Sequence, residues 1–426
     1  MSTIGQLGER IASLAKKVEE DQLRNDATPA AQQIAMELAE ASRELEQLVL
    51  GPRQALGVIV TFDIPNLVPE EGSVSYAELS SLCGLDEDRL TRILRYVMIN
   101  HIFREAPAGR VRHTPQSAHL AQSPAFCDFL RTIAAVFLPA CAAVPAALAR
   151  WPRTRATTEA AHGAARRTDA AFYDWLDRDE NAALRRNFDR GMEGISRAGQ
   201  RLQDTDLRAY PWGALPAAAA VVDVGGFGDL AAAYPSFSIV VQDLPRVIRQ
   251  TMEDQKNASG PESVTYQAHN CFDEQPVKNA DVYFMRHVFH NHPDAECIKI
   301  LTALLPALKP GSRVLVSEYI VPPAAELSGG LSTKAMSPFF ILSPTPKNLL
   351  DQTLLTNFAL SSSLPRNRQM DLLTMALFNA KERTKEEYSR LFEQASPALV
   401  FHGTHQVPDD PRSCVFEAVY QGGETK

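Results

Sequence analysis

The second half of the chain alternates short apolar runs with amphipathic segments, as strands and helices do when they follow one another. Four runs have the length of buried strands, and one segment repeats its apolar residues at helical spacing: the runs are 217–222, 237–241, 280–285 and 314–320, and the helical segment is 294–308. Strands that alternate with helices form a mostly parallel sheet with helices on both faces. The pattern therefore predicts a doubly wound α/β domain over residues 206–426.

The first half has helical spacing almost throughout and divides into three predicted parts. Residues 1–65 are predicted to be a helical arm that forms a dimer, and residues 117–205 a helical connector that contributes to the substrate pocket. Residues 66–116 combine a helix-turn-helix pattern with a short hairpin, which is the layout of a winged helix. Because acidic side chains flank its second helix, we interpret this part as a protein–protein module for dimerisation and not as a DNA-binding domain.

Composition narrows the classes of function. The chain has 426 residues, 45% of them hydrophobic, and a net charge of −8 that disfavours a nucleic-acid partner. No apolar run reaches the about 18 residues of a membrane span, and the N-terminus lacks the apolar core of a signal peptide. The six cysteines are scattered without a CxxC pair, so we expect reduced thiols in a cytoplasmic protein and no metal site.

The stretch between the first two predicted strands has the plan of a nucleotide-binding unit. The first strand leads to Asp223 and then to Gly225 and Gly226, and the second strand ends at Asp243. Glycines at this place let the backbone approach a ligand, and an acid at the end of the second strand can accept hydrogen bonds from ribose hydroxyls. Further polar residues are expected at the same edge of the sheet, because they end or follow other predicted strands: Asn270, His290 and Glu318.

Six motifs together carry a family resemblance that covers nearly the whole chain. They resemble, in order, motifs of S-adenosylmethionine-dependent small-molecule O-methyltransferases of fungal secondary metabolism: DVGG, VVQDLP, AHNCFDEQPV, ADVYFMRHVFHNHPD, LKPGSRVLVSEYIVP and DLLTMALFNAKERT. The resemblance implies a class I methyltransferase-like Rossmann domain. It also implies an all-α, winged-helix N-terminal half that forms an intertwined homodimer.

The resemblance also implies roles for individual residues. His290 matches the general base that takes a proton from the acceptor hydroxyl, and Glu318 and Glu382 match the two acids that orient it. A histidine oriented by carboxylates is suited to this chemistry because its pKa lies near neutrality. The residues implied as cofactor contacts are Asp223, Gly225, Gly226, Asp243, Asn270 and Arg286.

The chain departs from this family at three places. Only ten residues, Phe227 to Ser236, separate Gly226 from Phe237, whereas a crossover helix with its loops needs at least about 10–12 residues. The helix between the first two strands is therefore expected to have one or two turns, which leaves the cofactor's place cramped. An acid of the family is replaced by Asn270, and an Asp-Trp pair is replaced by Asn291 and His292. From the shortening we expect that the chemistry requires no cofactor.

These departures favour one branch of the family, the O-methyltransferase-like pericyclases of 2-pyridone alkaloid pathways. Those enzymes dehydrate an alcohol to a quinone methide and direct an Alder-ene or hetero-Diels–Alder closure. Such chemistry needs a shaped pocket and hydrogen-bond donors, for which Lys334, His162 and His290 are the candidates. Lys334 could instead be an exposed loop lysine, and His162 a packed histidine.

Two alternatives to a pericyclase remain open. Since His290, Glu318 and Glu382 are all present, the chain could be an active O-methyltransferase for a polyketide or alkaloid hydroxyl. It could also be a catalytically silent dimer or regulatory subunit. In each case the expected partners are a small molecule and a second copy of the chain, without nucleic acid or membrane.

Overall fold

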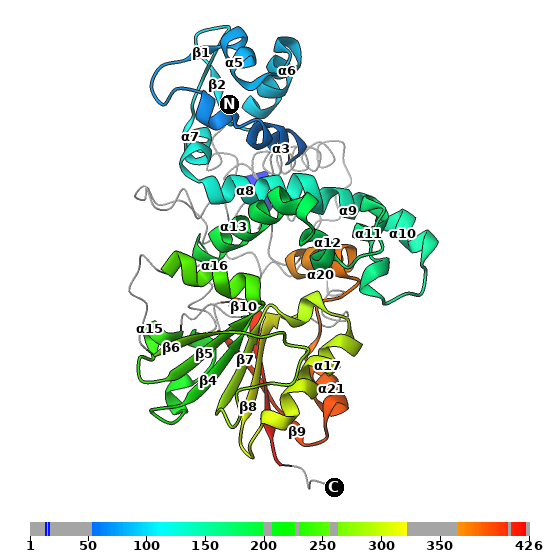
Figure 1. Ribbon diagram of the computed structural model, residues 1–426. Helices are drawn as coiled ribbons and strands as arrows, with labels where there is room; N and C mark the ends of the chain where they lie inside the picture. The colour runs from blue at the N-terminus through cyan, green and yellow to red at the C-terminus, as the bar shows by residue number, and fades with distance from the viewer. Residues whose placement is uncertain are drawn as a thin grey trace. The chain divides into compact units, whose positions relative to one another are not determined.

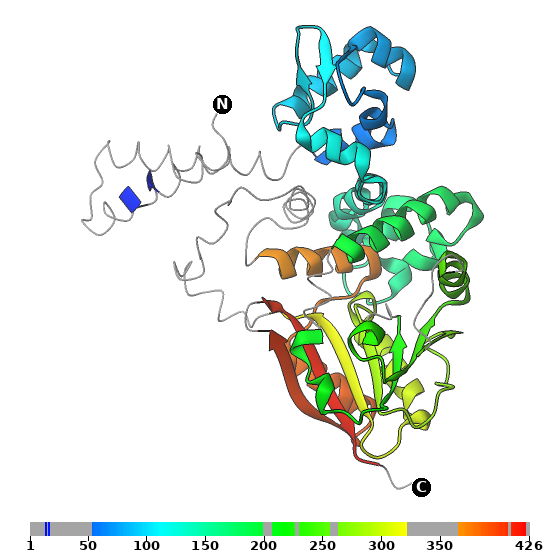
Figure 2. The same cartoon turned by 90° about the vertical axis from the view of Figure 1, so that its left-hand side faces the viewer.

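The computed structural model describes residues 13–14, 16–17, 53–198, 207–225, 230–255, 263–321, 365–407 and 410–422 (Figures 1 and 2). The chain divides into two compact units, each of which is described here by itself. The first comprises Met1–Leu138, Glu180–Ala198 and Leu331–Arg366, and the second Pro139–Asp179, Gly199–Gly330 and Asn367–Lys426. Residues 117–205, treated as one connector in the sequence, are thus divided between the two units.

The first unit contains a helix-turn-helix and a small sheet with strand order β1-β3-β2. Its elements are α3 (Arg53–Thr61), α4 (Ile64–Leu67), β1 (Val74–Ser75), α5 (Tyr76–Cys83), α6 (Glu87–Met98), β2 (Arg104–Glu105), β3 (Arg110–Arg112), α7 (Pro115–Gln122), α8 (Pro124–Thr132), η1 (Ile133–Phe137) and α13 (Ala182–Ala198). A capping box of Ser75 and Glu78 begins α5, and Asp86 caps α6. Leu79 and Leu94 are fully buried between these helices, so the winged-helix pattern forms as predicted.

The apolar stretch Pro124–Ala142 is the one helical segment, among the residues described, whose length and composition would allow it to cross a membrane. Its first part, α8, packs closely along α13 in the same unit. A Cβ added at Gly191 would lie 2.8 Å from the backbone of Phe129, and one at Gly194 would lie 2.5 Å from the Cβ of Ala125. The two glycines therefore allow the close helix contact of a packed core.

The second unit is built around a seven-stranded sheet with the order β6-β5-β4-β7-β8-β10-β9. The strands are β4 (Ala220–Val224), β5 (Ser238–Asp243), β6 (Val264–Ala268), β7 (Val282–Arg286), β8 (Arg313–Tyr319), β9 (Leu399–Val407) and β10 (Asp410–Tyr420). Strands β4 to β8 run parallel, whereas β10 is antiparallel to both β8 and β9. The predicted doubly wound, mostly parallel sheet is confirmed.

Successive side chains of the buried strands point to opposite faces and enter two separate cores. Val222 and Tyr283 pack on one face with α17 (Asp294–Leu304) and α21 (Lys385–Ala395). Val221 and Val282 pack on the other face with Trp212 and α15 (Leu230–Ala233). Further helical elements of this unit are α9 (Leu138–Ala142), α10 (Val144–Arg150), η2 (Thr157–Glu159), α11 (Ala161–Arg166), α12 (Phe172–Leu176), η3 (Asp179–Asn181), η4 (Trp212–Ala214), α16 (Pro245–Gln255), η5 (Phe289–Asn291), η6 (Leu305–Ala307) and α20 (Pro365–Phe378).

The connection between β4 and β5 is as short as the sequence predicts. Its helix, α15, has four residues, which is about one turn. Gly225 is described, but Gly226 and Phe227 lie outside the described residues. The predicted strands elsewhere agree with β7 and β8 to within two residues at each end, and the predicted helix at 294 begins at Asp294.

Candidate active site

The carboxyl ends of four adjacent parallel strands carry the predicted cofactor residues. Asp223 is buried near the end of β4, Asp243 ends β5, and Arg286 ends β7. Asn270 is exposed just after β6, where its Oδ1 accepts a hydrogen bond from the amide of Phe272 at 3.1 Å. Because parallel strands end at one edge, the sheet places these side chains along a single edge, where ligands of such folds bind.

Gly225 gives this edge a backbone conformation that other residues rarely adopt. Its φ is +70°, and its N–H donates to the carbonyl of Gln242 at 2.7 Å. A Cβ at this position would lie 3.0 Å from Cγ2 of Val288, which follows β7. The absent side chain therefore lets Val288 pack closely against the backbone that follows β4.

His290 lies in the short turn η5, directly after β7, and carboxylates hold both its backbone and its ring. Glu318 of β8 accepts hydrogen bonds at Oε1 from the amides of Phe289 (2.8 Å) and His290 (3.2 Å). Glu382 lies between α20 and α21, and its Oε1 is 3.0 Å from Nδ1 of His290. The structure thus brings together the three residues predicted to form the base and its orienting acids.

Burial strengthens the electrostatic interactions between the charged groups of this cluster. The His290 side chain is 13% exposed, and both carboxyl side chains are fully buried. Burial alone would lower the pKa of His290, but the nearby carboxylates of Glu318 and Glu382 raise it to about 9. Burial works against ionisation of Glu318, yet the two neighbouring histidines hold its pKa below the ordinary value. The pKa of Glu382 is raised, first by burial and also by the charge of Glu318.

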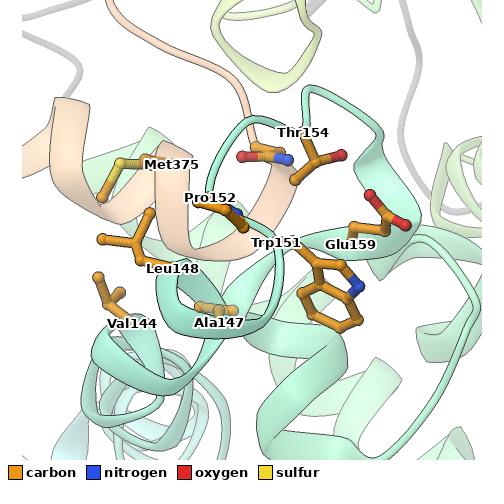
Figure 3. Close-up of a pocket in the computed structure, with 10 residues that line it drawn as sticks. Val144, Ala147, Leu148, Trp151, Pro152, Thr154, Glu159 and Met375 are labelled. Atoms are coloured by element: carbon orange, nitrogen blue, oxygen red, sulfur yellow. The ribbon is translucent and has the colours of Figure 1, made fainter.

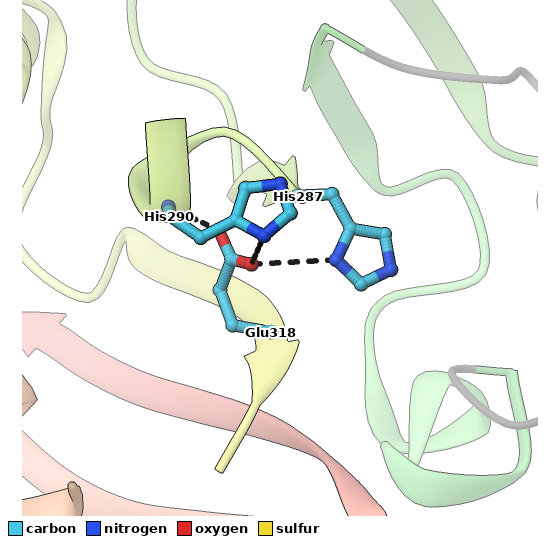
Figure 4. A group of neighbouring side chains, drawn as sticks. All are labelled: His287, His290 and Glu318. Atoms are coloured by element: carbon cyan, nitrogen blue, oxygen red, sulfur yellow. Dashed lines mark hydrogen bonds and ion pairs between the residues drawn. The ribbon is translucent and has the colours of Figure 1, made fainter. Parts of the chain in front are cut away.

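A second histidine, not identified from the sequence, shares Glu318 with the base. Nδ1 of His287 lies 3.3 Å from Oε2 of Glu318, and Nδ1 of His290 lies 3.7 Å from the same oxygen (Figure 4). One ligand atom from each of the three residues lies within 4.8 Å of the others, a grouping that a metal ion could use. Because Nδ1 of His290 also lies 3.0 Å from Glu382, we assign it a proton and interpret the group as a proton-transfer cluster.

His162 has surroundings of the opposite kind. It lies in the first turn of α11 and is 1% exposed, and its ring meets Phe172 and Trp175 edge-on at centroid distances of 5.1 Å and 4.6 Å. Neither ring nitrogen has a hydrogen-bond partner among the residues that the structure describes. Burial, with a smaller contribution from the Arg166 charge, lowers the pKa of His162 to about 4. His162 is therefore neutral at physiological pH.

Two predicted site residues, Lys334 and Gly226, lie outside the described residues.

The sequence reasoning also missed Arg383, whose fully buried guanidinium contacts the turn that carries His290. The signal that could have found it is its position directly after Glu382. The second unit also has a small cavity of about 50 Å³, lined in part by Leu148, Trp151 and Met375 (Figure 3), and no residue of the His290 cluster lines it. It is much smaller than the about 300 Å³ of typical ligand pockets.

Comparison with known proteins identifies the family. A profile described as the O-methyltransferase domain matches residues 150–346. A chlorophenol O-methyltransferase of Trichoderma longibrachiatum is 31% identical over 89% of this chain and 79% of its own length. The chain belongs to the O-methyltransferase family. Another relative, the O-methyltransferase pyvH of Aspergillus violaceofuscus, is 30% identical over 89% of this chain and 86% of its own.

Solved structures of the same fold include one that is described as a pericyclic reaction enzyme. That structure has a TM-score of 0.62 at 18% identity and covers 95% of this chain and 93% of its own. The structure of OxaC has a TM-score of 0.69 at 20% identity, covering 96% and 98%. A variant of LepI in complex with SAH and a substrate analogue has a TM-score of 0.63 at 19% identity, covering 96% and 94%.

The expectation that no cofactor is required is wrong. The chain belongs to a methyltransferase family, and its structural neighbours include LepI with SAM and OxaC with SAH and oxaline. S-adenosylmethionine is therefore indicated as the cofactor. The physical reason for the error is that the short β4–β5 connection reduces α15 to four residues, whereas Gly225 and the strand-end acids keep their places.

Proposed function

We propose that the protein is an S-adenosylmethionine-dependent O-methyltransferase that acts on a hydroxyl of a polyketide or alkaloid. The observation that carries this proposal is the His290 ring held 3.0 Å from Glu382, with Glu318 fixing the backbone of the same turn. The cofactor supplies an electrophilic methyl group. Asp223, Gly225, Asp243, Asn270 and Arg286 at the strand ends would hold it, and the positive φ of Gly225, which turns the backbone directly after β4, fits that role.

The chain's own residues supply the proton acceptor. Because Nδ1 of His290 faces Glu382, Nε2 is the nitrogen that accepts the proton of the substrate hydroxyl. The imidazolium that forms is stabilised by the two buried carboxyl groups, which is the same effect that raises the pKa of His290 to about 9. The cluster therefore favours proton removal at the moment when the hydroxyl oxygen becomes a nucleophile.

The test is transfer of a labelled methyl group from S-adenosylmethionine to a panel of phenolic and pyridone hydroxyl compounds. We expect transfer by the wild type and a loss of about 10²–10⁴-fold in His290→Ala, which lacks the base. His405→Ala is the matched control, because His405 also pairs with a carboxylate, Glu417 at 2.9 Å, but on strand β9. Absence of label uptake across the panel, or equal loss in both variants, would contradict the proposal.

His162 supports a second candidate, a pericyclase that acts on a 2-pyridone alcohol. A neutral, buried histidine with unsatisfied ring nitrogens among the described residues can donate a hydrogen bond to a carbonyl without acting as an acid. Protonated His290 would give a proton to the leaving hydroxyl as the C–O bond breaks. The pyridone hydroxyl would then return a proton to His290, which leaves water and a neutral quinone methide.

In this candidate, His162 would polarise the carbonyl during Alder-ene or hetero-Diels–Alder closure. The product profile of a reduced pyridone alcohol, compared between the wild type and His162→Phe, separates the two candidates. The pericyclase predicts cyclised products that change ratio in His162→Phe, whereas the methyltransferase predicts none. Unchanged spontaneous product ratios with wild-type protein would exclude the pericyclase.

We also propose that the protein forms a cytoplasmic homodimer through its N-terminal half. Within the first unit, three large apolar side chains near the helix-turn-helix are more than half exposed: Leu82, Tyr96 and Ile99. Exposed apolar side chains that lie in one region are typical of interaction surfaces. Light scattering should give twice the chain mass of 46.9 kDa, and a monomeric mass at micromolar concentration would contradict this proposal.

A further inference from the structure

Arg383 is buried in a way that its single carboxylate partner does not explain. Its side chain is fully buried, and its Nε donates to Oδ1 of Asp294 at 2.8 Å, although Asp294 itself is 30% exposed. Burying a guanidinium is costly unless every N–H finds an acceptor. The remaining donors of Arg383 are directed to backbone carbonyls.

Those carbonyls flank His290 on both sides. Nη1 of Arg383 donates to the carbonyl of Phe289 at 2.8 Å, and Nη2 donates to the carbonyl of His292 at 2.7 Å. A third carbonyl, that of Lys381, lies 3.3 Å from Nη1. The planar fork of the guanidinium thus spans the turn that presents His290, which a lysine with one ammonium could not do.

The same turn is held from its other side by Glu318. Its Oε1 accepts from the amides of Phe289 and His290, so the N–H groups of the turn face an anion while its carbonyls face a cation. Oppositely charged groups on the two ends of the peptide dipoles fix the turn's orientation. The contacts of Arg383 and of Glu318 Oε1 are made with the backbone of the turn, so they set where the His290 ring stands, while the Glu318 charge also raises the pKa of the ring.

Arg383 also fixes the position of the second acid. It directly follows Glu382, it forms a parallel bridge with Ile320, and its carbonyl accepts from the amide of Val321 at 3.2 Å. Ile320 and Val321 continue the strand that carries Glu318. The segment with Glu382 is therefore aligned with the end of β8, and the turn with His290 is aligned with both.

We propose that Arg383 is a positioning residue that sets the distance and angle between His290 and Glu382. This inference rests on the proposed role of His290 and deepens it. A shift of about 1 Å in such a group costs about 10²-fold in rate. We therefore expect Arg383→Lys, which keeps the charge but loses the fork, to lower kcat by about ten- to hundredfold with little change in KM.

A purely structural role would also lower activity through unfolding, so the deciding readout is the ring titration of His290 by NMR with labelled histidine. Arg383→Lys keeps the positive charge but loosens the contact between His290 and Glu382. The midpoint of the His290 ring titration should therefore move to lower pH. The control is Arg313→Lys, because Arg313 pairs with Glu417 at the opposite end of β8. This control should lower the melting temperature and leave the His290 midpoint unchanged.

The titration needs no turnover, so it tests the positioning role even if methyl transfer is not the reaction. An unchanged His290 midpoint in folded Arg383→Lys would overturn the inference, as would an equal shift in Arg313→Lys. If Arg383→Lys does not fold, Asp294→Asn removes the negative charge that faces the guanidinium and keeps the shape of the side chain at position 294. That variant should shift the midpoint in the same direction, and the absence of a shift would again overturn the inference.

Discussion

His290 and His162 are two largely buried histidines of the same unit whose surroundings drive their pKa values in opposite directions. His162 lies among aromatic rings, and burial lowers its pKa to about 4. His290 is also buried, but two carboxyl groups outweigh the burial and raise its pKa to about 9. The comparison shows that burial alone makes a histidine a neutral hydrogen-bonding group. Only paired acids make it a strong acceptor of protons.

The largest effect that separates the two histidines is expected from Glu318→Gln. The amide keeps the shape but removes the negative charge beside His290 and weakens the hold on the turn. By analogy with loss of an orienting carboxylate in a catalytic triad, methyl transfer should fall by about 10⁴-fold. The pKa of His290 should fall as well, while that of His162 stays unchanged. Ring titration by NMR checks both, and an unmoved His290 pKa would break the comparison.

The next effect concerns acid stability and His162. Its folded pKa of about 4 lies below the ordinary value of 6.5, so the unfolded chain binds the extra proton between these pH values. The stability from a neutral His162 is present above pH 6.5 and is lost as the pH falls towards 4. The free energy of unfolding should fall by about 3 kcal/mol. His162→Phe should not show this loss, because it has no titrating group at this position.

Urea denaturation of the wild type and His162→Phe at pH 7 and pH 4.5 measures this difference. The gap between the two proteins should close or reverse at the lower pH. An equal difference in the free energy of unfolding at both pH values would show that His162 is not neutral in the folded protein. The contrast between His162 and His290 would then be wrong.

A smaller effect is expected from Glu382→Gln. Glu382 accepts the Nδ1 hydrogen bond of His290, and its own pKa is raised by burial and by Glu318. Because an amide oxygen can still accept this hydrogen bond, the loss in methyl transfer should be about tenfold. Steady-state kinetics should place this loss in kcat. If Glu382→Gln lost as much methyl transfer as Glu318→Gln, the two acids would contribute equally to stabilising the His290 imidazolium, which would contradict this prediction.

The sequence predicted the sheet from local patterns and the His290 cluster from a family resemblance. Buried parallel strands need continuous apolar runs, whereas Glu382 lies in a charged stretch of the sequence and was found only because its motif matches the family. Arg383 and His287 could not be found in the same way, since their roles depend on which backbone groups approach them. His287 adopts a φ of +52°, which no residue pattern around it announces.

The cofactor prediction failed for a different reason. It treated the length of one connection as decisive, although the residues that would hold a nucleotide are placed by the strand ends and by Gly225. A short helix such as α15 changes one side of a site, whereas the order of the strands fixes which residues meet at the edge of the sheet. Local sequence length is therefore a weaker guide to ligand binding than the register of the parallel strands.

The most direct test of the account is the pH dependence of kcat/KM for labelled methyl transfer between pH 6 and pH 10, using an acceptor whose hydroxyl does not titrate in that range. A base with a pKa of about 9 is mostly protonated at neutral pH. The rate should therefore rise about tenfold per pH unit and level off near pH 9. A rate that is flat across this range, or that falls above pH 9, would contradict the assignment of His290 as the proton acceptor.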